Sequence, residues 1–217
     1  MGNFTMSIGN AILSMLTAAS YAVFLRSLIF SGGLGASEVI RSAQRNSEIV
    51  LDSALVSVFA AAAAAVCRVL VSPPVLSQEK GALFPSLAEL PYSLLAAVFG
   101  YVLLAIYLLV CGTITLLPIK AKRLLLRRIG MSALNTLVMS VPLLMFRLGY
   151  DMPRAVGMGL GAGISFLLVS LMVNSGMHIL QQNKAIPPMF AGVPATLIYT
   201  GLLALAATGF TGEVLFQ

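Results

Sequence analysis

Long apolar runs constrain the fold of this chain more than any other feature of its sequence. A membrane-spanning helix needs about 20 mostly apolar residues, and runs of that length recur along the chain. With 59% hydrophobic and 9% charged residues, the chain also carries too little charge for the surface of a soluble domain. The sequence therefore predicts an all-α membrane protein with six transmembrane helices, at about 6–30, 49–72, 91–117, 127–146, 154–181 and 190–211.

Basic residues lie in the short loops between the apolar runs, so the net charge of +6 does not indicate a nucleic-acid-binding patch on a folded domain. Eight of them follow spans one, three and five, and four lie on the opposite side. Because loops rich in Lys and Arg stay in the cytoplasm, this bias predicts that both termini lie outside. The eight are Arg41, Arg45, Lys120, Lys122, Arg123, Arg127, Arg128 and Lys184; the four are Arg68, Lys80, Arg147 and Arg154.

The chain repeats itself once. The stretches "SIGNAILSMLTAASYAVFLRSL" and "RIGMSALNTLVMSVPLLMFRLG" align without a gap, so that Ser14 falls on Asn135 and Arg26 on Arg147. Each copy begins a unit of three spans, and an odd number of spans places the two units in opposite orientations. The sequence thus predicts an inverted 3+3 repeat, with 1–117 as the first half and 118–212 as the second. Residues 213–217 resemble the remnant of an engineered protease site and are left out of the functional argument.

Polar side chains in spans one and four are the candidates for a central site. In inverted-repeat proteins these elements often lie near the middle of the bilayer. An interhelical hydrogen bond would explain the same residues without any ligand. The candidates are Ser14, Thr17, Asn135, Thr136 and Ser140.

Arg26 and Arg147 stand at equivalent ends of the two repeats, where they would contact an anion or gate a path. Both also lie close enough to a span end to reach the interface with their long side chains, which needs no function. Glu48 and Asp52, at the start of span two, are typical of charges that cap a helix N-terminus.

No pattern of catalytic residues accompanies these polar groups. Cys67 and Cys111 sit inside apolar runs and are interpreted as buried free thiols. The glycines of "GMGLGAGISF" (157–166) indicate close helix packing. The sequence contains no nucleophile–base pair and no metal-ligand cluster at helical spacing, so an intramembrane enzyme is the least favoured interpretation.

The second half resembles the six-span membrane subunits of the Rnf and Nqr electron-transport complexes. The resemblance rests on "LNTLVMSVPLLMFRLG", on the glycine-rich span and above all on "IPPMFAGVPATLIYTGLLALAATGFTG" at 186–212. In the first half only the polar first span and a glycine-bearing turn near 31–37 match. The resemblance implies a bacterial or archaeal inner-membrane protein, the inverted repeat, and pairing with a second six-span subunit.

The resemblance also implies an iron–sulfur cluster between paired subunits, and here this chain departs from the family. Each family member supplies one cysteine from a Leu-Cys-Pro in the first span and one from a Thr-Asn-Cys in the fourth. The corresponding runs here are "SLIFSGGLG" and Leu134-Asn135-Thr136, so Thr136 stands where the second cysteine is expected. Such clusters need thiolate ligands. We therefore expect this chain to bind no cofactor of its own.

Two functions follow as predictions. The first is a non-catalytic subunit of a redox-driven ion-translocating complex, embedded in the bilayer beside a second six-span subunit or a copy of itself. Flavin or iron–sulfur groups would then belong to partner subunits. The alternative is a stand-alone inverted-repeat transporter or channel for a small solute or ion, with Arg26 and Arg147 along its path.

Overall fold

A computed structural model describes residues 2–25, 29, 34–44, 48–71, 90–116, 122–183, 186–187, 189–190 and 192–211. Within these ranges all regular secondary structure is helical, which confirms the predicted class. The elements in chain order are α1 (Gly2–Ser20), the π-helix η1 (Tyr21–Leu25), α3 (Ala36–Ala43), α4 (Ile49–Leu70), α5 (Tyr92–Leu116), α6 (Lys122–Ala133), α7 (Thr136–Arg147), α8 (Met152–Gln182) and α9 (Val193–Thr211).

Much of this helical structure is apolar enough to cross a bilayer. Four stretches have the necessary length and hydropathy, and they coincide with predicted spans two to five: Ile49–Leu70, Tyr92–Leu116, Leu125–Arg147 and Met152–Gln182. Two shorter apolar stretches, Ile8–Val23 and Val193–Ala207, fall in predicted spans one and six. The structure thus supports a multi-pass membrane protein. The number of six spans, the inverted repeat and the division of the chain after residue 117 stay predictions.

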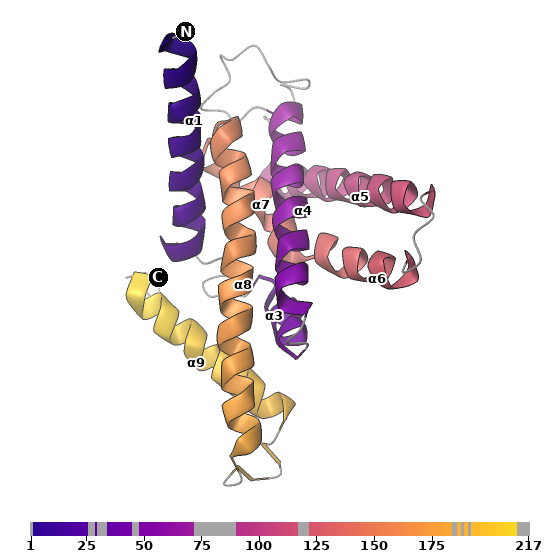
Figure 1. The fold of residues 1–217 in the computed structure, drawn as a ribbon, viewed down its shortest axis with the longest axis vertical. Coiled ribbons are helices and arrows are strands. Elements are labelled where there is room, and N and C mark those ends of the chain that lie inside the picture. The colour runs from indigo at the N-terminus through magenta and orange to yellow at the C-terminus, as the bar shows by residue number, and fades with distance from the viewer. Residues whose placement is uncertain are drawn as a thin grey trace.

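Helix α8 is the centre of the fold, with α1 along one side and α4 along the other (Figure 1). Its glycines make this possible by presenting two faces without side chains. A Cβ on Gly159 would lie 2.5 Å from the backbone of Ala61 in α4, and one on Gly163 would lie 1.7 Å from the Ser57 hydroxyl. A Cβ on Gly157 or Gly161 would instead meet backbone oxygens of α1, at 2.2 and 2.6 Å. The predicted role of these glycines in close packing is confirmed.

Helices α5 and α6 lie side by side and run across the direction of α4 and α8 (Figure 1). Helix α5 is held by few contacts, because only Leu95, Phe99 and Leu103 are buried in its 25 residues. The ring of Phe146 in α7 packs edge-on against Phe99 and Tyr92 of α5, with centroids 6.2 and 6.4 Å apart. Other apolar residues of α5 are partly buried against the core, whereas Tyr101, Leu108 and Leu109 are exposed.

The predicted fourth span, about 127–146, lies within the apolar stretch Leu125–Arg147, and this stretch consists of two helices. Helix α6 ends at Ala133, and α7 begins at Thr136. Between them Asn135 has an extended backbone (φ −91°, ψ 138°) and caps α7 with its own side chain. Asparagine is favoured at this position because its side-chain oxygen can accept a hydrogen bond from a backbone N–H that has no partner within the helix. Pro142 lies inside α7 and does not end it.

Candidate functional site

The break at Asn135 meets the glycine turn that precedes α3. The backbone N–H of Gly35 donates a hydrogen bond to Thr136 Oγ1 at 2.9 Å. Gly35 has a left-handed backbone (φ +76°), and a Cβ there would lie 3.0 Å from Asn135 Oδ1. Glycine is therefore suited to this position both by conformation and by space. The starts of α3 and α7, about a hundred residues apart in sequence, lie against each other here.

Asn135 is buried, with 1% of its surface exposed. Its Oδ1 accepts a hydrogen bond from the Leu137 N–H at 2.9 Å, which satisfies one of the free donors at the start of α7. Its backbone oxygen accepts from the Met139 N–H at 3.1 Å and begins the helical pattern. The side chain of Asn135 thus caps α7, and only its Nδ2 remains available for another partner.

The hydroxyls of the other predicted polar residues bond within their own helices. Ser14 Oγ donates to the Ala11 carbonyl at 2.8 Å, Thr17 Oγ1 to the Ser14 carbonyl at 2.9 Å, and Ser140 Oγ to the Leu137 carbonyl at 2.7 Å. Among the described residues, no hydrogen bond joins Ser14 or Thr17 to Asn135 or Thr136. A central site shared by all of these residues stays a prediction.

Arg147 and Ser140, which the sequence singled out separately, line one groove. Its volume is about 640 Å³, and its other walls are Leu34, Tyr92, Leu143 and Leu144. The Arg147 side chain is exposed at the C-terminal end of α7, where a positive charge is favourable. Arg26 lies outside the residues whose side chains the structure describes, so its predicted equivalence with Arg147 is not tested.

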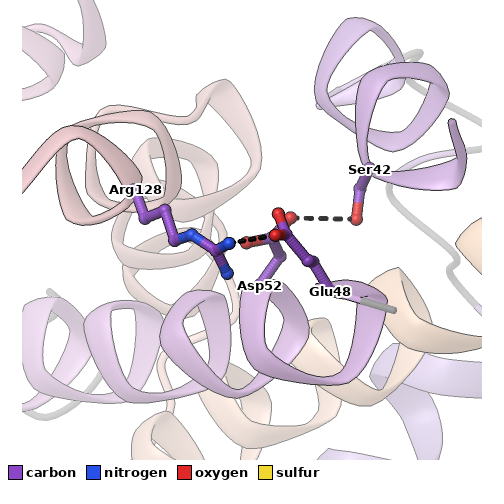
Figure 2. A network of polar contacts seen from close by, with 4 residues as sticks. All are labelled: Ser42, Glu48, Asp52 and Arg128. Carbon is purple, nitrogen blue, oxygen red and sulfur yellow. Dashed lines mark hydrogen bonds and ion pairs between the residues drawn. The ribbon is translucent and has the colours of Figure 1, made fainter. Parts of the chain in front are cut away.

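A cluster of charged residues lies next to the break. The sequence did not predict that these residues lie together. Ser42 Oγ at the end of α3 donates to Asp52 Oδ2 at 3.2 Å, and Arg128 of α6 forms an ion pair with Glu48. Figure 2 shows the Glu48 and Asp52 carboxylates next to each other, with Arg128 on one side and Ser42 on the other. The side chains of Arg128 and Glu48 are 13% and 26% exposed. The cluster ties α3, α4 and α6 together.

The predicted capping role of Glu48 and Asp52 needs correction for Glu48. Glu48 does occupy the N-cap position of α4, but its side chain makes no capping hydrogen bond and turns to Arg128 instead. The partly buried guanidinium offers the carboxylate a charged partner, which is stronger than a neutral backbone N–H. A separation of 80 residues leaves no local signal of this pair in the sequence.

We expect the Glu48–Arg128 pair to show energetic coupling. Because the pair is partly buried, the destabilisation of the Glu48→Gln, Arg128→Gln double variant should be smaller than the sum of the single effects by about 1 kcal/mol. Thermal unfolding in detergent measures the cycle. Glu38→Gln with Arg127→Gln is the matched control, since both residues are described and no ion pair joins them; its effects should add within about 0.5 kcal/mol. Additive effects at Glu48 and Arg128 would contradict the pairing.

The residues present do not fit the iron–sulfur cluster that the family resemblance implies. Thr136 offers a hydroxyl that already accepts the Gly35 N–H, where a thiolate would be needed. Cys67 is fully buried in α4 and Cys111 is half-buried in α5, so neither belongs to the break between α6 and α7. Within the part of the chain that the structure describes, no group of three or more His, Cys, Asp and Glu side chains is placed to hold a metal ion.

The comparison with known proteins identifies relatives over part of the chain. It is 36% identical over 80 residues to the A subunit of the ion-translocating oxidoreductase complex of Aromatoleum aromaticum, and 38% and 34% identical over 80 residues to the proteins of that name from Colwellia psychrerythraea and Rhodobacter capsulatus. Over these 80 residues the chain is similar to the A subunits of ion-translocating oxidoreductase complexes. The match covers 37% of this chain, and the chain spans 41% of the length of these relatives. No protein-family model matches it.

This relationship confirms the family resemblance that the sequence predicts, namely to membrane subunits of Rnf and Nqr complexes. It also agrees with the apolar helices, which are typical of a multi-pass membrane protein. The names of the relatives describe their complexes, and they do not by themselves describe the activity or partners of this chain.

Proposed function

We propose that this chain is an integral membrane subunit of a redox-driven, ion-translocating complex of the Rnf type, in a bacterial or archaeal inner membrane. The observation that carries the proposal is the similarity over 80 residues to the A subunits of ion-translocating oxidoreductase complexes. Four long apolar helical stretches support a position within the bilayer. In this proposal the chain is a non-catalytic component, and flavin and iron–sulfur groups belong to its partners.

The proposed arrangement has six spans in two inverted halves. It is supported by the order of elements in each half, where a short helix, α3 or α7, is followed by a long apolar helix, α4 or α8. Gly35 at the start of α3 and Asn135 at the start of α7 then occupy corresponding places. This pairing differs from the sequence alignment, which puts Ser14 on Asn135. We also retain the prediction that both termini lie outside.

We further propose that the chain supplies no ligand to an iron–sulfur cluster. The support is chemical, because the fourth-span position has Thr136 in place of a thiolate and neither cysteine lies at the break. The apolar face of α5, with exposed residues such as Tyr101 and Leu109, is the surface we assign to lipid or to a second six-span subunit.

Isolation from the chain's own host tests this function. When the tagged chain is solubilised in a mild detergent, subunits that hold flavin or iron should co-purify with it. Absorption, iron analysis and mass spectrometry detect them. A parallel sample in a harsh detergent should release the chain colourless and iron-free. A homo-oligomer without any redox partner under mild conditions would overturn the proposal and favour the transporter, for which the groove beside Arg147 offers a site.

A further inference from the structure

A small chamber lies between the break at Asn135 and the charged ends of α3, α4 and α6. Its volume is about 30 Å³. The charged residues Glu38, Arg41, Asp52 and Arg128 line it, together with others that include Asn135 and Phe166. One water molecule needs at least about 10–15 Å³ of such volume. This volume is enough for one or two water molecules.

Two residues that line this chamber each have a buried donor without an acceptor in the described chain: Asn135 Nδ2 and Arg128 Nε. The orientation of the Asn135 amide is settled by its cap, because Oδ1 must face the Leu137 N–H. Nδ2 is therefore the end that is left. A buried donor without an acceptor costs about 1–3 kcal/mol. Buried polar groups normally find a partner in the protein or in ordered water.

The charges around the chamber select the kind of guest. Two carboxylates, Glu38 and Asp52, and two guanidinium groups, Arg41 and Arg128, line the chamber, so the lining charges sum to zero and favour neither a cation nor an anion. A neutral molecule that accepts from the two donors and donates to Asp52 satisfies all three groups. We propose that this chamber is a hydration site, in which one or two ordered water molecules join Asn135 and Arg128 to Asp52.

This inference goes beyond the proposed function and does not depend on it. It gives the break in the fourth span a polar connection to Asp52 and, through Ser42, to the end of α3. A helix break within an apolar chain is stable only where its polar groups face protein or water. Arg128 lines the chamber and also forms the ion pair with Glu48.

Radiolytic footprinting of the full chain in lipid nanodiscs tests this site, because a water molecule bound inside a protein yields hydroxyl radicals that oxidise its neighbours. Phe166 lines the chamber and is 2% exposed, whereas Phe99 is 1% exposed and lies elsewhere in the core. We expect Phe166 to be oxidised several-fold faster than Phe99, with the added oxygen taken from ¹⁸O-labelled water. Equal and slow oxidation of the two rings would show a dry chamber and overturn the proposal.

Two variants sharpen the test. Ser132→Leu fills the chamber from α6 and should reduce oxidation of Phe166 to the level of Phe99, whereas Ser20→Leu on the exposed side of α1 should leave it unchanged. Arg128→Lys keeps a positive charge for Glu48 but removes Nε, and should give an intermediate rate. Unchanged oxidation of Phe166 in a folded Ser132→Leu protein would place its water elsewhere and also overturn the site. If that variant does not fold, the comparison of Phe166 oxidation with Phe99 oxidation in the unaltered protein still tests the proposal.

Discussion

Replacing Gly159 by valine is expected to push α8 away from α4 and to destabilise the fold strongly. A Cβ at this position would lie 2.5 Å from the backbone of Ala61 and 2.7 Å from that of Ala60. Backbone atoms inside a helix cannot move aside as the end of a flexible side chain can. Overpacking of this kind costs about 1–3 kcal/mol and occasionally more. The measurement is the midpoint of thermal unfolding in detergent, with size-exclusion chromatography to detect aggregation.

Gly201→Val in α9 is the matched control for this substitution. Gly201 is also a helical glycine, but a Cβ there would meet no atom within 4 Å. The two variants therefore share the same change in helix propensity and differ only in packing. The unfolding midpoint of Gly201→Val should stay close to that of the unaltered protein. If Gly159→Val behaved in the same way, the close contact between α8 and α4 would be contradicted.

The packing of α8 illustrates which helix contacts can be predicted from sequence alone. Its glycines predicted close approach, because small residues at a spacing of four leave one face of a helix bare. The sequence could not tell that two such faces interleave, with Gly159 and Gly163 against α4 and Gly157 and Gly161 against α1. Which helix lies on which face depends on distant contacts, and these have no local signature.

The candidate site was harder to predict than the fold. Apolar residues continue on both sides of Asn135 and Thr136, so apolar periodicity indicates one helix. The break arises because the side chain of Asn135 offers the Leu137 N–H a partner and starts a new helix there. The sequence drew attention to Asn135 and Thr136 as polar residues, but their contact with Gly35 and the neighbouring Glu48–Arg128 pair join segments far apart in the chain.

Asn135→Ala is expected to destabilise α7 and the break as a unit. It removes the acceptor of the Leu137 N–H, whose bond is 2.9 Å long. Loss of an N-cap of this type costs about 0.5–2 kcal/mol, and the upper part of that range is expected here because Leu137 is fully buried and its donor cannot turn to bulk water. Thermal unfolding in detergent measures the loss, and circular dichroism before unfolding reports whether helix content falls.

Asn135→Ser separates the cap from the other contacts of the amide. Serine caps helices about as well as asparagine, so Asn135→Ser should recover most of the stability that Asn135→Ala loses, although it lacks Nδ2. Equal loss in both variants would mean that the cap contributes little and that the stability depends on Nδ2 and its guest in the chamber. Equal stability of all three proteins would contradict the break itself, because alanine favours an uninterrupted helix at this position. The pair of variants therefore distinguishes a capped break, a hydrated break and a continuous span.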